Sequence, residues 1–392
     1  MNNVSSSNSQ KVHVPELRFH EFREDLQQSK LSDISVYKTK RATDVKSHYI
    51  STENLLQNCM GIVPYTDETA IDGISFSIND ILLGNIRPYL KKAWLAEFDG
   101  VCSTDVLVLH PLKIEPLYFK YLICRDKFFT YVMSSAKGSK MPRGDKAFIM
   151  DMTISLPSIN EQKKLASMLM LIDTLISKQE KLVDEIKLYK RGLINQIFDN
   201  KLSFSKKSEW HKYQLSDILK ERKTYCEKDG TYEHATLSKE GVYGKTDRYE
   251  RDYLVSSDDK KYKITKLGDI CYNPANLKFG VICLNTCGDA IFSPIYITFE
   301  VNKKFNKEFL AFCLTRNDFI NKALQYQQGT VYERMAVSPE DLLSMSINLP
   351  PKDIQDSLAK VILKIEDKVS KTEMKLTELK QMRIALLQKM FI

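Results

Sequence analysis

Two stretches of the chain decide its fold: LPSINEQ at residues 156–162 and LPPKDIQ at residues 349–355. With the first placed over the second, the two copies stay aligned at an offset of 193 residues, without a gap, as far as Phe198 and Phe391. Identical pairs along this alignment include Leu165/Leu358, Ala166/Ala359, Ile172/Ile365, Ser177/Ser370, Lys178/Lys371, Glu180/Glu373, Glu185/Glu378 and Leu193/Leu386. This gapless agreement indicates an internal duplication rather than similar composition.

Each copy predicts one long amphipathic helix. Positions that alternate by four and three residues are apolar in eight cases of ten in each copy, which is the pattern of a coiled-coil seam. The polar interruptions also match, Gln179 with Thr372 and Lys190 with Arg383, and polar seam residues can fix the register of a helix pair. Two unrelated surface helices are the alternative. We predict helix pairing through Leu165, Leu169, Ile172, Ile176, Val183, Ile186, Leu358, Ile362, Ile365, Val369, Leu376 and Leu379.

The segments before the two helices are also related, although their offset drifts from 184 to 191 residues. LSDI occurs at residues 31–34 and again at 215–218, and KGS at 137–139 matches QGT at 328–330. Both segments contain short strand-like runs bounded by Gly, Pro and Asn, followed by a helix-like stretch. We therefore expect an α+β protein with two duplicated α/β domains, separated by two long helices that form an antiparallel coiled coil. The expected boundaries are a loose tail at 1–10, a first domain at 11–155, a helical spacer at 156–200, a second domain at 201–348 and a second spacer at 349–392.

Composition narrows the class of protein without naming a partner. The chain has 392 residues and a formal net charge of +8, and the excess is spread thinly along it, so a nucleic-acid partner is permitted but not required. Its eight cysteines include no C-x-x-C pair, which argues against a zinc ribbon and favours reduced cytoplasmic thiols. No apolar run reaches the roughly 18 residues that a membrane span needs. We expect a cytoplasmic protein with no membrane partner.

Catalytic motifs are missing from the sequence. There is no G-x-x-x-x-G-K-S/T phosphate loop, no G-x-G-x-x-G and no H-E-x-x-H. The run Asn273-Pro274-Ala275-Asn276 faintly resembles the Asn-Pro-Pro-aromatic motif of amino-methyltransferases, but without a glycine-rich cofactor loop a strand-end turn is the better interpretation. We expect no catalytic residue, no bound metal and no cofactor on this chain.

The order of several short motifs, repeated in both halves, carries a family resemblance. These motifs are Arg18-Phe19, Asp80-Ile81-Leu82, Asn85 to Leu90, Gly100 to Asp105, Gly138, Leu156-Pro157, Glu161-Gln162, the helix end Gln196-Ile197-Phe198 and, in the second half, Gly268-Asp269-Ile270, Tyr272-Asn273-Pro274, Gly280, Ser293-Pro294, Gly329, Leu349-Pro350-Pro351 and Gln355. With them, the chain resembles the specificity (S) subunit of type I restriction–modification enzymes along nearly its whole length. Ile354 departs from the family, which usually has Glu before the Gln at this position.

The resemblance implies a function in sequence-specific binding of double-stranded DNA. Each of two target-recognition domains would read one half of a bipartite site, and a pseudo-twofold protein suits such a target. The implied partners are two methyltransferase subunits and restriction/translocase subunits. S-adenosylmethionine, ATP and Mg would be bound by those partners, and the specificity subunit itself would catalyse nothing.

The residues that touch DNA are predicted from donor chemistry in loops. Arg and Gln can make two hydrogen bonds to guanine and adenine, whereas Lys mostly contacts phosphate. Tyr89 and Tyr272 are assigned to the core rather than to base stacking. The predicted DNA-binding residues are Arg87, Lys91, Lys92, Lys137, Ser139, Lys140 and Arg143 in the first domain, and Lys245, Arg248, Arg251, Gln327, Gln328, Thr330, Tyr332 and Arg334 in the second.

Two other functions stay open at this point. A fused DNA-modification enzyme would need cofactor motifs that this sequence lacks. A coiled-coil adaptor without a DNA role would differ from a specificity subunit in showing no salt-dependent binding to duplex DNA.

Overall fold

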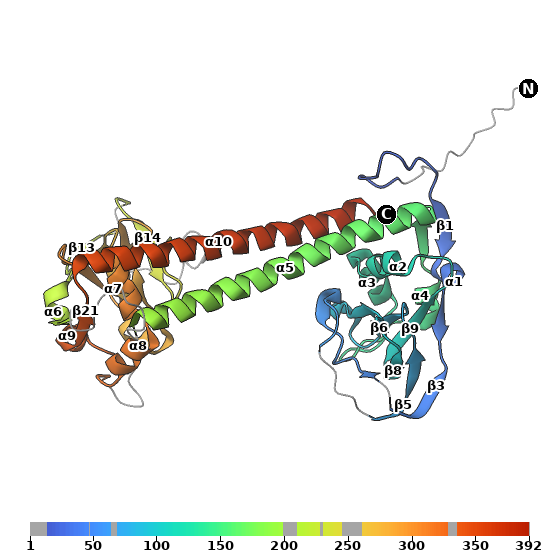
Figure 1. Cartoon of the computed structure of the whole chain (residues 1–392), viewed down its shortest axis with the longest axis horizontal. Coiled ribbons are helices and arrows are strands. Elements are labelled where there is room, and N and C mark those ends of the chain that lie inside the picture. The colour runs from blue at the N-terminus through green and yellow to red at the C-terminus, as the bar shows by residue number, and fades with distance from the viewer. Residues whose placement is uncertain are drawn as a thin grey trace, which may run out of the picture. The chain divides into compact units, whose positions relative to one another are not determined.

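The computed structural model describes residues 14–46, 48–63, 69–198, 210–227, 230–244, 261–327 and 335–391. The chain divides into two compact units (Figure 1). Unit 1 comprises residues 1–183 and 372–392, and unit 2 comprises residues 184–371. The expected fold class, two α/β domains and two long paired helices, is confirmed. Each unit consists of one mixed domain together with the parts of both long helices that pack on it, and the finer domain boundaries stay predictions.

Unit 1 contains two main sheets. Within the described residues, β2-β9-β6-β7 is antiparallel throughout, and β3-β5-β8-β4 includes one parallel pair, β4 with β8. A further antiparallel pair, β1 with β10, leads into the long helix α5. The elements are β1 (Gln27–Lys30), α1 (Leu31–Ile34), β2 (Ser35–Lys38), β3 (Arg41–Lys46), β4 (Tyr49–Ile50), η1 (Gln57–Cys59), β5 (Thr69–Phe76), β6 (Ile81–Gly84), η2 (Pro88–Leu90), β7 (Ala93–Leu95), β8 (Gly100–Cys102), β9 (Val106–Pro111), α2 (Pro116–Ile123), α3 (Asp126–Ser134), α4 (Lys146–Met150), β10 (Thr153–Leu156) and α5 (Ile159–Phe198).

Strand β6 shows why the sequence of the first domain contains an uninterrupted apolar run. Successive side chains of a strand point to opposite faces of the sheet. Ile81 and Leu83 face the core shared with helices α2, α3 and α5, while Leu82 faces the core shared with the second sheet. Figure 1 shows α2 and α3 between α5 and strands β6 and β9. A strand covered on both faces must be apolar at every position.

Unit 2 repeats this arrangement. Its sheets are β12-β20-β17-β18 and β13-β16-β19-β14-β15, and β14 with β19 is the parallel pair that corresponds to β4 with β8. In β17, Ile270 and Tyr272 enter the core with the helices and Cys271 enters the core between the sheets. The elements are β11 (His211–Gln214), α6 (Leu215–Ile218), β12 (Leu219–Glu221), β13 (Tyr225–Cys226), β14 (Glu233–Leu237), β15 (Val242–Gly244), β16 (Tyr262–Thr265), β17 (Ile270–Tyr272), η6 (Pro274–Phe279), β18 (Ile282–Leu284), β19 (Ala290–Phe292), β20 (Ile297–Val301), α7 (Lys307–Leu314), α8 (Asn317–Leu324), α9 (Pro339–Ser344), β21 (Ser346–Leu349) and α10 (Lys352–Lys389).

Helices α5 and α10 pair antiparallel within each unit, as predicted. In unit 1, Arg383 forms an ion pair with Asp173, and the Gln179 side chain donates to the Thr372 carbonyl at 2.8 Å. In unit 2, Lys190 pairs with Glu366 at 2.7 Å. The polar seam residues are therefore used, since each makes a polar contact across the pair. Of the predicted seam residues, Leu165, Leu169, Ile172, Ile176, Val183, Ile186, Leu358 and Ile362 are buried, and Ile365, Val369, Leu376 and Leu379 are half-buried.

One buried glutamine joins each long helix to its domain. The Gln162 Nε2 donates to the Pro157 carbonyl at 2.9 Å, and its Oε1 accepts from the Glu115 N–H, at the start of α2, at 3.0 Å. Gln355 makes the same two bonds, to the Pro350 carbonyl at 2.8 Å and from the Asn306 N–H, at the start of α7, at 2.9 Å.

The first copy adds a contact that the second lacks. Glu161 is buried and accepts two hydrogen bonds from Arg18, at 2.8 and 2.7 Å, and these bonds raise the pKa of the guanidinium. The second copy has Ile354 at the matching position, so this carboxylate contact is absent there. In the described part of the chain, no helix combines the length and apolar character that crossing a membrane requires.

Candidate nucleic-acid interface

The loop between β6 and β7 presents a tight turn built on two unusual backbone conformations. Arg87 (φ 52°, ψ 64°) and Lys91 (φ 51°, ψ 52°) are left-handed and flank the short helix η2, which begins at Pro88. This conformation costs a non-glycine residue roughly 1–2 kcal/mol, so the surrounding contacts must hold it. The Arg87 N–H donates to the Pro142 carbonyl and the Lys91 carbonyl accepts from the Cys59 N–H, both at 2.8 Å. The turn is therefore fixed from both sides.

The predicted loop at residues 137–143 lies against this turn. Lys137 and Arg143 exchange both backbone hydrogen bonds at 3.0 Å, and Arg143 also bridges to Ile86. Gly138 closes the loop with φ 102°, a conformation that glycine adopts without strain. The structure thus brings together two stretches of predicted DNA-binding residues that are some 50 positions apart in the sequence.

Most of the predicted cations in these loops already have acidic or carbonyl partners. Lys91 pairs with Asp126 at 2.6 Å, Arg143 with Asp105 at 3.1 Å, and Lys137 with Asp145 at 4.0 Å. The Lys92 ammonium donates to the Thr52 carbonyl at 2.6 Å.

Three of the predicted residues are differently placed. Arg87, Ser139 and Lys140 are exposed, and within the described residues their side chains have no hydrogen-bond or ion-pair partner. The guanidinium and ammonium groups of Arg87 and Lys140 are thus available to an anionic ligand.

Unit 2 forms an equivalent loop between β17 and β18. Asn273 caps the helix η6 by accepting from the N–H groups of Ala275 and Asn276, at 3.1 and 3.3 Å, so the strand-end turn expected for this motif is correct. The Pro274 carbonyl of this loop accepts from the Val337 N–H at 3.3 Å. In unit 1 the loop is instead the donor, because the Arg87 N–H donates to the Pro142 carbonyl of the later segment.

Most of the predicted DNA-binding residues of unit 2 lie outside the described residues. These are Lys245, Arg248, Arg251, Gln328, Thr330, Tyr332 and Arg334. Gln327 is described: it is half-buried, and its Nε2 atom is buried without a partner among the described residues. It follows the helix α8, which packs against η6.

A buried carboxylate anchors the base of each hairpin. Asp80 accepts from the Ser77 N–H at 2.7 Å and from Lys38 at 2.6 Å, and contacts the His110 Nδ1 at 2.7 Å. Asp269 accepts from the Lys266 N–H at 2.9 Å and from the Arg222 guanidinium at 2.7 and 2.9 Å. The hydrogen bonds to Asp269 raise the pKa of Arg222.

The prediction that Tyr89 and Tyr272 lie in the core is half right. Tyr272 is fully buried and its hydroxyl donates to the Val337 carbonyl at 3.1 Å; burial raises its pKa well above the ordinary value. Tyr89, assigned to the core, is 50% exposed, because the turn buries Pro88 instead and leaves the tyrosine outside. The equivalent loop exposes Phe279, at 62%, which sequence reasoning did not select.

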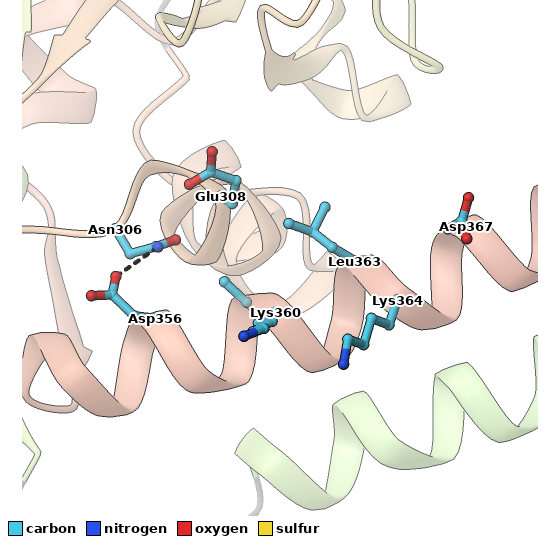
Figure 2. Close-up of a pocket in the computed structure, with 8 residues that line it drawn as sticks. Asn306, Glu308, Asp356, Lys360, Leu363, Lys364 and Asp367 are labelled. Carbon is cyan, nitrogen blue, oxygen red and sulfur yellow. Dashed lines mark hydrogen bonds between the residues drawn. The ribbon is translucent and has the colours of Figure 1, made fainter.

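An open cleft lies on unit 2 between α7 and α10 (Figure 2). Figure 2 shows Asn306 turned toward Asp356, and their hydrogen bond measures 2.8 Å. Glu308, Asp356 and Asp367 outnumber the lysines of the cleft, Lys360 and Lys364. Because its carboxylates outnumber its cations, this cleft does not suit a polyanion, and the loops described above are the better nucleic-acid surface.

Comparison with known proteins matches the first domain to a family model. Residues 24–188 match the family model described as the type I restriction modification DNA specificity domain. The resemblance to type I specificity subunits is confirmed. The matched range contains the first mixed domain, its hairpin loop and most of α5, whereas the second domain lies outside it.

Two curated proteins and two solved structures are similar along most of the chain. The MjaVIII specificity subunit of Methanocaldococcus jannaschii is 24% identical over 342 residues, covering 81% of this chain and 79% of that protein. The putative MjaX specificity subunit of the same organism is 24% identical over 326 residues, covering 74% and 72%. The S subunit from M. genitalium aligns with a TM-score of 0.62 at 13% identity, over 97% of this chain and 99% of that one. A chain from a structure of type I R-M complex assembly aligns with a TM-score of 0.57 at 15% identity, over 95% and 98%.

Proposed function

We propose that this chain is the DNA specificity subunit of a type I restriction–modification system. In this proposal, each mixed domain reads one half of a bipartite double-stranded DNA target. The observation that carries it is the repetition: each unit presents a strand-to-strand loop that is hydrogen-bonded to a segment much later in the chain, and the first domain matches the specificity-domain model.

The partners follow from the proposed role. Two methyltransferase subunits, and restriction/translocase subunits, assemble with the chain and carry S-adenosylmethionine, ATP and Mg. This chain supplies binding and position and catalyses no step. Double-stranded DNA is its ligand.

The available side chains divide the work of binding. Arg87 and Lys140 are exposed and free of protein partners among the described residues, so they can contact phosphate without breaking an internal ion pair. Each such contact releases about one counterion and makes affinity fall with salt. Lys91, Lys92, Lys137 and Arg143 hold the loops in shape, and a contact with DNA would have to compete with the partners they already have.

An exchange of domains tests the proposal. Residues 11–155 are replaced by the matching segment of a relative, the chain is expressed with methyltransferase subunits, and methylated adenines are mapped in cellular DNA. One half-site should change while the other half-site is retained, because each domain reads alone. Cells that express the methyltransferase without this chain provide the control. Methylation that is independent of the chain, or a simultaneous change of both half-sites, would contradict the proposal.

A further inference from the structure

The two hairpin loops are equivalent in construction although their sequences differ. Each connects two antiparallel strands, β6 to β7 and β17 to β18, and each contains a short helix that begins with a proline, Pro88 or Pro274. Each is contacted by the third short α-helix of its unit, α3 or α8. Each is hydrogen-bonded to the segment that comes after that helix in the chain. A feature that recurs at both loops therefore needs an explanation that applies to both domains, not one that depends on the packing of a single loop.

The recurring feature is an exposed aromatic ring. Tyr89 is 50% exposed and Phe279 is 62% exposed. A single exposed apolar side chain needs no explanation, but an aromatic ring left in water in the same hairpin loop of two diverged copies loses burial energy twice. A ligand that covers both rings would recover that energy.

Charge around the two rings points to an anionic ligand. Arg87, unpartnered among the described residues, lies two residues before Tyr89. Lys278 lies over the Phe279 ring, 5.0 Å from its centroid, and the exposed Lys239 lies beside Gly280.

The turns at the opposite ends of the same strands differ. There, Ile78 and Leu267 donate their N–H groups to the carboxylates of Asp99 and Asp289, at 2.8 and 3.1 Å. Each of these turns therefore carries a carboxylate as well as a lysine, Lys38 bonded to Ser77 in unit 1 and Lys307 beside Gly268 in unit 2, whereas the charges beside the aromatic rings named above are cationic.

We propose that Tyr89 and Phe279 are the aromatic DNA contacts of the two hairpin loops, one for each half of the target. This inference rests on the proposed function and adds to it. Each ring packs on apolar parts of the duplex, the base edges or the deoxyribose, while Arg87 and Lys278 bind the adjacent phosphates. Apolar side chains make such contacts with thymine methyl groups or between base steps.

The structure offers matched controls for the test. Ile78 and Leu267 are 53% and 61% exposed, occupy equivalent turns in the two units, and lie at the other ends of β6 and β17. Tyr89→Ala and Phe279→Ala are compared with Ile78→Ala and Leu267→Ala, each in the full chain assembled with methyltransferase subunits. The binding of each complex is titrated, at several salt concentrations, with a duplex that contains the target sequence identified by methylation mapping.

We expect Tyr89→Ala and Phe279→Ala each to weaken binding roughly ten-fold, since that is the scale of burying one large apolar side chain. The loss should be equal at all salt concentrations, because no counterion is involved. Ile78→Ala and Leu267→Ala should bind within about two-fold of the unaltered complex. Thermal unfolding of all four variants shows whether each one folds. We expect all four to fold, because the substituted side chains are exposed.

Two results would overturn the inference. If both aromatic variants bind like the unaltered complex, the rings are not DNA contacts. The same follows if the aliphatic controls lose as much affinity as the aromatic variants lose. In either case the proposed function stands. If the unaltered complex itself shows no salt-dependent affinity for duplex DNA, the proposed function fails and this inference fails with it.

Discussion

Units 1 and 2 anchor the same hairpin with the same buried carboxylate but surround it differently. Asp80 and Asp269 each accept from the backbone N–H three residues earlier, Ser77 in one unit and Lys266 in the other. Around this constant bond, Lys38 and His110 are replaced by Arg222 and Thr298. Contacts to backbone have persisted between the copies, and contacts to side chains have been exchanged.

Unit 2 also buries a charged side chain where unit 1 has a half-buried apolar one. Lys263 in β16 pairs with Phe292, and Ile74 in β5 pairs with Cys102 at the matching position. The Lys263 side chain is 2% exposed and its ammonium bonds Glu221 at 2.7 Å. The second unit therefore depends on an ion pair at a place where the first depends on packing, and this difference makes the two units unequal in their response to mutation.

The largest effect should follow from removing one member of that pair. Glu221→Ala leaves Lys263 charged and buried, and such a change costs about 3–5 kcal/mol of unfolding free energy. Urea unfolding of the full chain measures it. Lys263→Ile installs the residue of unit 1 and should cost less, because Glu221 keeps Lys223 at 3.3 Å. If the two variants lost the same unfolding free energy, the unpaired buried charge of Lys263 would not be the cause of the loss in Glu221→Ala.

A smaller effect separates the two hairpin anchors. Asp269→Ala should lower the unfolding free energy by about 3 kcal/mol, because Arg222 is largely enclosed. Asp80→Ala should cost about 1 kcal/mol less, since the Lys38 and His110 side chains are 27% and 41% exposed and can turn to water. The same unfolding experiment ranks the pair, and a larger loss at Asp80 would contradict this account.

The ion pair found only in the first copy should show a moderate coupling. A double-mutant cycle of Arg18→Ala and Glu161→Ala should give about 1–2 kcal/mol, because Glu161 is buried and Arg18 retains a bond to the Glu24 carbonyl. Ile354→Ala in unit 2 serves as the comparison, with a loss from apolar packing alone that does not change with salt. A coupling near zero would make Arg18 an ordinary surface residue.

The smallest effect belongs to the seam. Lys190 and Glu366 are about one-third exposed, so Glu366→Ala should change the unfolding free energy by less than about 1 kcal/mol, and less still in high salt. Leu358→Ala, which removes a buried seam side chain, is the positive control at about 2 kcal/mol or more. A loss at Glu366 that matches the loss at Leu358 would mean that charge, not apolar packing, holds the helices together.

The seam was readable from sequence because helical periodicity is local. The apolar intervals identify Leu165 and Leu358 as inward-facing without knowledge of the partner, and the matched polar breaks indicate that the two helices pair. That Gln179 bonds Thr372, while Lys190 and Arg383 bond other residues, is visible only in the structure. The duplicated α/β domains follow from the same repeat. Both are consequences of residues that are neighbours along the chain or along one helix.

The candidate interface was only partly readable, because it depends on contacts between distant residues. Nothing in the sequence places Arg87 against Pro142, or gives Arg143 an aspartate partner while Lys140 has none in the part of the chain that the structure describes. The outward direction of Tyr89 depends on the left-handed conformations around it, and those are held by the hydrogen bonds from the Cys59 N–H to Lys91 and from the Arg87 N–H to the Pro142 carbonyl. The repeated proline and the aromatic residue in each loop were the available signal for Tyr89 and Phe279.

The glutamine at the start of each long helix has an evolutionary consequence. Gln162 and Gln355 hold their domains only through a carbonyl and an N–H group, and the residues that supply the N–H groups, Glu115 and Asn306, are unlike. Because these hydrogen bonds are made to backbone groups, they do not depend on which side chains the domain carries at those positions. A foreign domain that carries a prolyl carbonyl and a helix start at the same places can be inherited as a cassette, so a lineage can acquire a new target without having to rebuild the helix that carries it.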